Sequence, residues 1–268
     1  MSLSSRGKRP RWLCGALLVL SCALWLVPAA AAPKKVPLMT GESLDESGKQ
    51  KPVNPRTRQM LDYLERELDI QFDIKLMPWI RAESNAMAGH GMIFGLSKTP
   101  ERVRELRFSD VAAANNLWLV TRSDEVFRFN AIEDLRGKTL GAVRGYSYGE
   151  EFDRAKNSVF RVADDIASRP VRLTRLMLRR VDAVLLYQPD SDSAAELEAQ
   201  VNALMAPRLK EMGITDRVPY SVLPKPMQVD NQLYFAVLKS KDDGMIDKIN
   251  AALARRRKSA SLPASRPH

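Results

Sequence analysis

Two loops in this sequence carry side chains that can bind a small polar molecule. The first loop follows the apolar segment Met92–Phe94 and holds Ser97, Thr99 and Arg102. A hydroxyl group donates one hydrogen bond, and the planar guanidinium of an arginine matches a carboxylate through two parallel ones. The spacing therefore predicts a carboxylate-binding subsite directly after a buried strand.

The second loop, Arg144–Gly149, follows the strand-like segment Thr139–Val143. Gly145 and Gly149 let the backbone approach a ligand closely, because glycine has no Cβ. A helix that is predicted to begin at Glu150 directs free N–H groups toward the same place. This loop is expected to form the second wall of the site.

The first loop also has a purely structural interpretation. Ser97 and Thr99 can cap a helix that starts at Pro100, since a hydroxyl residue before proline is a common helix start. Arg102 can cap a helix or pair with a neighbouring glutamate. Both interpretations stay open at the level of sequence.

Other residues near these loops are equally ambiguous. Trp79 and Arg81 either belong to a cleft wall or, for Trp79, to the core. Arg144 either contacts the ligand or is a solvated residue at the rim. Tyr146 and Tyr148 alternate, so we expect one to face the cleft and the other to pack.

An enzymatic interpretation is weaker. Gly145–Gly149 matches G-x-S-x-G, with Ser147 after a strand and before a helix. That chemistry needs a later histidine as base, but the only one is His268 at the very end, and His90 lies upstream. Without a base, Ser147 is an ordinary hydroxyl. We expect no enzyme, no metal site and no cofactor, because the histidines are unrelated and no phosphate-binding G-x-x-x-x-G-K-[ST] pattern occurs.

The N-terminus has the layout of a secretory signal peptide. Four cations within the first eleven residues precede the apolar stretch Leu13–Val27, and small residues follow it. The stretch is shorter than a good membrane span. We expect cleavage near Ala30–Ala32 and export to the periplasm. An uncleaved anchor and a lipoprotein at Cys22 are the alternatives.

Composition excludes other classes. Both cysteines, Cys14 and Cys22, lie in the predicted signal peptide, so the mature chain has no disulfide. The net charge of +10 is concentrated at the ends: four cations lie in the signal peptide and five in the last fourteen residues. The body is therefore nearly neutral, which excludes a nucleic-acid footprint. Residues 259–268 are expected to be a disordered tail, with contact to anionic lipid as an alternative.

Alternating strands and helices must position the two loops. Apolar residues recur at helical spacing in some segments and alternate or run together in others, which predicts α/β sheets with helices on both faces. The expected strands are Val36–Met39, Phe72–Leu76, Met92–Phe94, Leu117–Val120, Thr139–Val143, Val159–Val162, Val181–Leu186 and Gln232–Leu238. The expected helices include Trp79–Met87, Ser193–Met212 and segments starting at Asn54 and Glu150.

An ordered set of motifs resembles a known family. The set comprises Pro78–Arg81, Gly95–Arg102, Leu106–Asp110, Lys138–Gly149 and Val181–Leu185. In this order and spacing it is similar to the family 3 bacterial extracellular solute-binding proteins, the periplasmic polar-amino-acid receptors of ABC transporters. The resemblance covers about residues 35–256.

The resemblance implies a fold, a division and a site. It implies the two-lobed type II periplasmic-binding-protein fold, an α/β fold in which each lobe is a mixed sheet flanked by helices, joined by two crossover strands. Lobe one would comprise residues 34–120 plus 224–258 and lobe two residues 121–223, with crossings near Val120–Thr121 and Leu223–Pro224. The arginine matching Arg102 holds the ligand carboxylate in that family. The ligand-binding residues carried over or placed beside these loops are Trp79, Arg81, Gly95, Ser97, Thr99, Arg102, Arg144, Gly145, Tyr146, Ser147, Tyr148 and Tyr187.

One departure from the family pattern bears on the ligand. Amino-acid binders usually have an acid at the end of the strand matching Val181–Leu186, and this sequence has Tyr187 there. A neutral phenol supplies no charge to hold an amine. Either Asp190, Glu42 or Glu83 replaces the acid, or the ligand lacks an amine.

The sequence thus predicts a monomeric periplasmic receptor that closes around a small anionic or zwitterionic solute and delivers it to an inner-membrane ABC permease. One alternative is a sensor module for another membrane partner. A second is a periplasmic dehydratase of the cyclohexadienyl type, which would need a carboxylic acid such as Glu42, Glu150 or Glu151 in the cleft.

Overall fold

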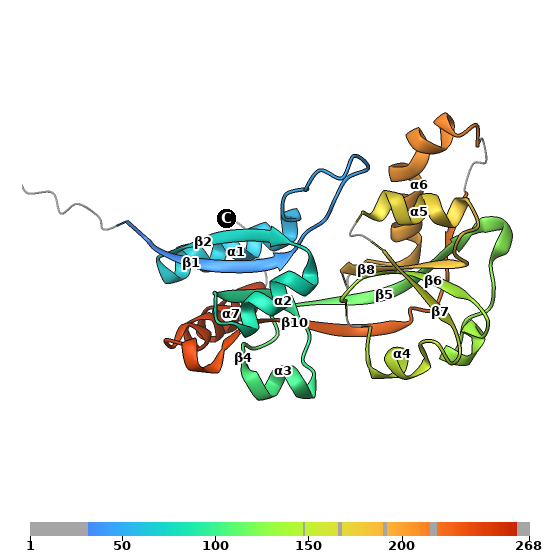
Figure 1. Cartoon of the computed structure of the whole chain (residues 1–268). Helices are drawn as coiled ribbons and strands as arrows, with labels where there is room; N and C mark the ends of the chain where they lie inside the picture. The colour runs from blue at the N-terminus through green and yellow to red at the C-terminus, as the bar shows by residue number, and fades with distance from the viewer. Residues whose placement is uncertain (1–31, 147, 166–167, 190–191, 215–218, 262–268) are drawn as a thin grey trace, which may run out of the picture. The chain divides into compact units, whose positions relative to one another are not determined.

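The computed structural model describes residues 32–146, 148–165, 168–189, 192–214 and 219–261 (Figure 1). The chain divides into two units, Met1–Ala32 and Pro33–His268, and the description below concerns the second. Ser147 and Asp190, named above, lie outside the described residues.

Helices and strands alternate along the chain, as predicted. In chain order the elements are β1 (Lys34–Gly41), α1 (Pro55–Leu68), β2 (Ile70–Met77), α2 (Trp79–Met87), β3 (Met92–Leu96), α3 (Pro100–Glu105), β4 (Leu106–Phe108), β5 (Ala113–Arg122), β6 (Thr139–Val143), α4 (Glu150–Ala155), β7 (Arg161–Asp165), α5 (Arg169–Met177), β8 (Ala183–Pro189), α6 (Ala194–Glu211), β9 (Tyr220–Val222), β10 (Gln228–Leu238) and α7 (Met245–Ser261). Short 3-10 helices occupy Ser123–Glu125, Ile132–Leu135 and Lys239–Lys241.

The strands of the described residues form one mixed sheet in the order β2-β1-β3-β10-β5-β8-β6-β7, with β4 paired to β10 and β9 to β5. We call β1–β4 with the end of β10 the first half-sheet, and β5–β9 the second half-sheet. In the first, β1 pairs in parallel with β2 and β3, and β10 runs antiparallel to β3 and β4. In the second, β6 pairs in parallel with β7 and β8, and β5 runs antiparallel to β8 and β9.

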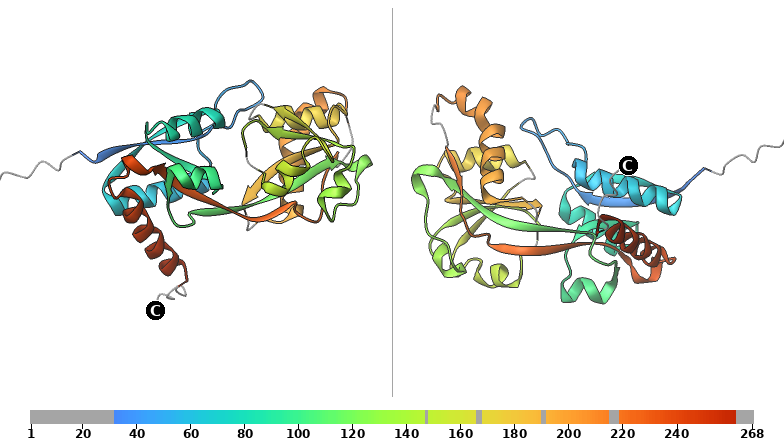
Figure 2. Two further views of the ribbon diagram at one scale, coloured as in Figure 1. Left: turned by 60° about the horizontal axis from the view of Figure 1, so that its bottom comes forward. Right: turned by 180° about the vertical axis from the view of Figure 1, so that it is seen from behind.

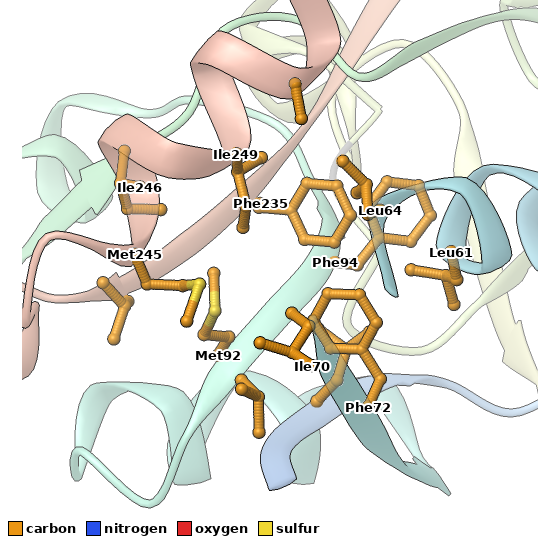
Figure 3. Close-up of a cluster of buried hydrophobic side chains, with 14 of the residues drawn as sticks. Leu61, Leu64, Ile70, Phe72, Met92, Phe94, Phe235, Met245, Ile246 and Ile249 are labelled. Carbon is orange, nitrogen blue, oxygen red and sulfur yellow. The ribbon is translucent and has the colours of Figure 1, made fainter. Parts of the chain in front are cut away.

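Each half-sheet has apolar cores on both of its faces. In the first half-sheet, α1 and α7 cover one face, where Phe72, Phe94 and Phe235 pack together (Figure 3). Its other face packs against α2 through Ala82 and Ala86. The second half-sheet is covered by α4 on one face and by α5 and α6 on the other. Helices on both faces confirm the α/β class expected from the alternation.

Two strands connect the half-sheets. β5 and β10 pair at Ala113–Leu117 with Gln228–Leu233, and both views of Figure 2 show them running side by side from one half to the other. Val120 and Leu223, where the crossings were expected, are buried in the cores of the second half-sheet. The strands therefore pass between the halves a few residues away from the expected places, because alternate residues of β5 are fixed in the second half's two cores.

Local signals explain most element boundaries. The Asn54 side chain accepts a hydrogen bond from the Thr57 N–H, so it caps α1 as predicted. The strand expected at Val159–Val162 begins only at Arg161, because the Val159 N–H bonds back to Ala155 in the turn after α4. At the other end, α7 continues to Ser261, so its last residues overlap the expected tail.

In the described part of the chain, no helix is both long and apolar enough to cross a bilayer.

Candidate functional site

A cavity of about 430 Å³ lies between the half-sheets and is called the first cavity below. The first half-sheet contributes residues of α2 and the α3 region, and the second contributes the β6–α4 loop, α4 and β7. Its lining residues are Glu83, Met87, Thr99, Glu101, Arg102, Gly145, Tyr146, Tyr148, Phe152, Asp153, Lys156, Val162 and Asp164. Thr99, Arg102, Gly145, Tyr146 and Tyr148, predicted from two distant loops, are therefore brought to one place.

Arg102 lines this cavity, but its guanidinium is already engaged. Nε donates to Glu83 Oε1 at 2.6 Å and Nη2 donates to Glu83 Oε2 at 2.9 Å. Nη1 donates to the Ser97 carbonyl oxygen at 3.1 Å and faces the Ser97 hydroxyl at 3.4 Å. Arg102 is only 7% exposed. The two-point recognition that the sequence predicts for a ligand carboxylate is made here by Glu83 of α2.

Thr99 serves as a helix cap and as a cavity wall. Its hydroxyl accepts a hydrogen bond from the Arg102 N–H at 3.3 Å, at the start of α3, and Pro100 occupies the first helical turn. The structural interpretation of Thr99 therefore holds, and it does not remove Thr99 from the cavity lining.

Trp79, the first residue of α2, packs between the two halves. Its indole lies over Gly95, whose φ is +93°, and leaves no room for a side chain at Gly41, where a Cβ would come within 2.9 Å of Trp79 Cε3. Its ring meets Tyr146 edge-on, with ring centroids 5.7 Å apart. Trp79 thus forms a wall in contact with both halves, and it is not among the lining residues of either cavity described here.

Gly145, in the second half, lies directly against α2. Its φ is +81°, in the left-handed region that favours glycine. A Cβ at this position would overlap Cγ1 of Ile80. The close approach anticipated for this glycine therefore occurs, with α2 as the neighbour.

Three tyrosines form an aromatic cluster next to this contact. Tyr148 and Tyr187 stack with ring centroids 5.7 Å apart and 3° between the ring planes, and Tyr146 lies 6.3 and 6.4 Å from them. The Tyr148 hydroxyl accepts a hydrogen bond from the Val143 N–H at 2.8 Å. Burial raises the pKa of all three phenols, so they stay neutral at physiological pH. Tyr148 is part of the core, whereas Tyr146 reaches Trp79.

A smaller cavity of about 140 Å³, called the second cavity below, lies behind the tyrosines. Arg169 and Arg172 of α5 line it together with the tyrosine cluster, and Glu42 and Ser43 close it from the first half. The remaining lining residues are Val143, Leu185 and Leu186. Tyr187 thus sits in a cationic, aromatic environment.

The burial of these arginines has an electrostatic consequence. Arg172 is only 5% exposed. Arg169 donates to the Tyr187 carbonyl oxygen at 3.2 Å. Burial, and next the charge of Arg172, lower the pKa of Arg169 to about 10. Two cations therefore share a poorly solvated space.

Four other predicted residues line neither cavity. Arg81 and Arg144 are exposed. The Trp79 ring covers Gly95, and the Ser97 carbonyl oxygen accepts a hydrogen bond from Arg102. Within the described residues, no group of three or more histidine, cysteine or acidic side chains is placed to hold a metal ion.

Sequence reasoning missed Arg169 and Arg172. A signal was present: Ser168 precedes an Arg-Pro pair, which marks a helix start, and arginines three apart share a helix face. The Ser168 hydroxyl indeed accepts from the Val171 N–H at 3.4 Å. Cations near the N-terminus of a helix interact unfavourably with the helix dipole, so these arginines do not serve to stabilise α5.

Solved structures with this arrangement were found by structural comparison. Holo ArgBP from T. maritima matches with a TM-score of 0.59 at 20% identity, covering 83% of this chain and 90% of that one. An ancestral arginine-binding protein bound to arginine matches with a TM-score of 0.62 at 20% identity, covering 86% and 95%. AbpA, an amino acid ABC transporter substrate-binding protein from Streptococcus pneumoniae bound to L-arginine, matches with a TM-score of 0.61 at 15% identity, covering 84% and 90%.

This chain has the substrate-binding-protein fold. The periplasmic-binding-protein fold expected from the motifs is thereby confirmed, over most of the length of both chains. At these identities the likeness establishes the fold alone. No protein-family model matches the sequence, and no curated protein matches it either. The first cavity is a candidate ligand-binding site, because residues of both half-sheets line it.

Proposed function

We propose that this chain is an exported solute-binding receptor. It captures a small carboxylate-bearing polar solute, an amino acid or a related compound, by closing its two halves around it, and delivers the solute to an inner-membrane ABC permease. The observation that carries the proposal is the first cavity, because residues of both half-sheets line it.

The size and lining of the cavity suit a small metabolite. Its volume of about 430 Å³ falls in the range of roughly 300–1,000 Å³ that is common for small-molecule sites. Aromatic rings of Tyr146, Tyr148 and Phe152 supply apolar surface, and Glu83, Arg102 and the other charged residues can orient a polar ligand. Such a mixture favours a polar organic solute over a purely apolar one.

Contacts between the halves suit a closing mechanism. The Ser168 hydroxyl, at the start of α5, donates to the Asp45 carbonyl oxygen at 3.0 Å. Arg56, just inside α1, pairs with Asp192, just before α6, at 3.0 Å. Polar contacts of this kind can form and break as the halves move on β5 and β10. A ligand that binds both halves then shifts the population toward the closed state.

The structural neighbours support an amino acid or a similar solute. Several of them were solved with arginine or glutamine bound, and others are substrate-binding proteins of amino acid ABC transporters. For this chain, transport remains part of the proposal, and a sensor with another membrane partner would use the same cavity. The predicted signal peptide favours the periplasm for either form.

A dehydratase has one observation in its favour. Glu42, one of the three acids considered for it, lines the second cavity, whereas Glu150 and Glu151 are exposed at the start of α4 and line neither cavity. A carboxyl group in a cavity is the type of residue that a dehydratase of this kind needs.

A ligand screen tests the proposal. Thermal unfolding of the mature chain would be followed with amino acids, amines, organic acids and prephenate. For a receptor, we expect carboxylates of one chemical class to raise the melting temperature, because the ligand binds only the folded state. Conversion of prephenate would favour the dehydratase instead. If no carboxylate in the panel stabilises the chain, the proposed function is wrong.

A further inference from the structure

We infer that the ring of Tyr146 sets the maximum length of the solute, because it closes the second cavity off from the first. The inference rests on the proposed function and specifies its ligands by size, as solutes that fit within the first cavity alone. Without this ring, the chain of a longer solute would reach the second cavity.

The two cavities meet at the aromatic cluster. Tyr146 and Tyr148 line the first cavity, of about 430 Å³, and also the second, of about 140 Å³. Their rings therefore form part of the wall between the two spaces. The second cavity is large enough for a further part of a solute, since an engineered protein cavity of about 150 Å³ binds benzene.

Tyr148 is the fixed part of this wall. Its hydroxyl accepts a hydrogen bond from the Val143 N–H at 2.8 Å, and its ring stacks on that of Tyr187. On its other side the Phe152 ring lies 5.0 Å away between centroids, and Tyr148 is only 6% exposed. Removal of this ring would open the core of the second half-sheet, so Tyr148 has a structural role that Tyr146 does not share.

Tyr146 is held less firmly. It is partly exposed, and its ring is tilted by 37° and 35° against Tyr148 and Tyr187, with centroids more than 6 Å away. Its hydroxyl makes no hydrogen bond to any residue that the structure describes. Packing alone therefore keeps this ring between the cavities, and a change of side chain at this position can join them without removing a hydrogen bond.

Contacts with the first half complete the wall. Tyr146 belongs to the β6–α4 loop of the second half, and its ring meets Trp79 of α2 edge-on. Its hydroxyl lies 3.4 Å from the place that a Cβ would take at Gly41, the last residue of β1. A solute chain that extended past the first cavity would occupy the place where Tyr146 meets these residues. Such a solute would oppose closure, and a ligand favours the closed state only as far as it binds that state better.

Two homologous series of probes test the inference by calorimetry on the mature chain. They are the unbranched L-2-amino acids from alanine to 2-aminooctanoate and the unbranched carboxylates from acetate to octanoate. For the wild type, we expect affinity to rise with chain length up to a limit and then to fall. In Tyr146→Ala the limit should move by at least two methylene groups. Since each buried methylene strengthens binding about fourfold, the homologue two methylenes beyond the wild-type limit should gain at least about tenfold over the shortest member that binds.

Tyr146→Phe is the matched control, because it keeps the ring and removes only the hydroxyl. It should keep the wild-type length limit, whatever its affinity. An unchanged limit in Tyr146→Ala, with its unfolding still cooperative, overturns the inference, while binding of either series still supports the proposed function. If Tyr146→Ala does not fold, Tyr146→Leu replaces it and should move the limit by at least one methylene. If neither series binds either protein, the inference is wrong, and the proposed function fails with it if no other carboxylate stabilises the chain.

Discussion

Arg102 and Glu83 form a two-point ion pair between α3 and α2, with N–O distances of 2.6 and 2.9 Å. The arginine is buried, and the Glu83 side chain is 24% exposed. Because both helices belong to the first half-sheet, the pair holds this wall of the first cavity together whether or not a ligand is present.

Replacement of Arg102 should therefore lower stability without ligand. Arg102→Ala leaves Glu83 partly buried without its partner, and we expect the free energy of unfolding to fall by about 1–3 kcal/mol. Denaturant unfolding of the ligand-free chain measures this. The double variant with Glu83→Gln should recover part of the loss, as a double-mutant cycle would show. Unchanged stability in Arg102→Ala would contradict a structural role for the pair.

Gly145 should tolerate no side chain when the halves are closed. Gly145→Ala adds a Cβ that overlaps Ile80, so we expect weaker ligand binding as well as strain from the positive φ. Gly137→Ala is the matched control, because its φ is +76° and no atom lies within 4 Å of the added Cβ. Both variants should lose about 1–2 kcal/mol of stability from backbone strain. Only Gly145→Ala should also lose affinity for the ligand. If both variants bind the ligand equally well, the contact between Gly145 and Ile80 is not needed for closure.

Trp79 should report ligand binding by its fluorescence. Residues 33–268 contain two tryptophans, Trp79 and Trp118. Trp79 contacts Tyr146 across the two halves, whereas Trp118 is buried in the core of the second half-sheet. A ligand-dependent change in emission is expected to survive Trp118→Phe and to disappear in Trp79→Phe. Persistence of the change in Trp79→Phe would show that the Trp79 contact does not respond to ligand.

Local sequence signals predicted the elements well. Trp79–Met87 and Thr139–Val143 were expected and observed with the same bounds, because apolar spacing and flanking Pro or Gly residues mark their ends. A helix starting at Pro100 was one of two interpretations of the first loop, and α3 begins at that residue. The short strand β4 was not predicted, because its three residues carry too little periodicity to be recognised.

The sequence by itself determined the α/β alternation and which two loops carry the polar side chains, since both follow from local patterns of apolar, glycine and hydroxyl residues. The tertiary structure alone decided which charges are already paired. Glu83 lies nineteen positions before Arg102, and no local pattern shows that α2 turns this acid toward that arginine. In the same way, only the packing of α5 beneath the tyrosine cluster brings Arg169 and Arg172 to a cavity, because desolvation and pairing depend on neighbours that are distant in the chain.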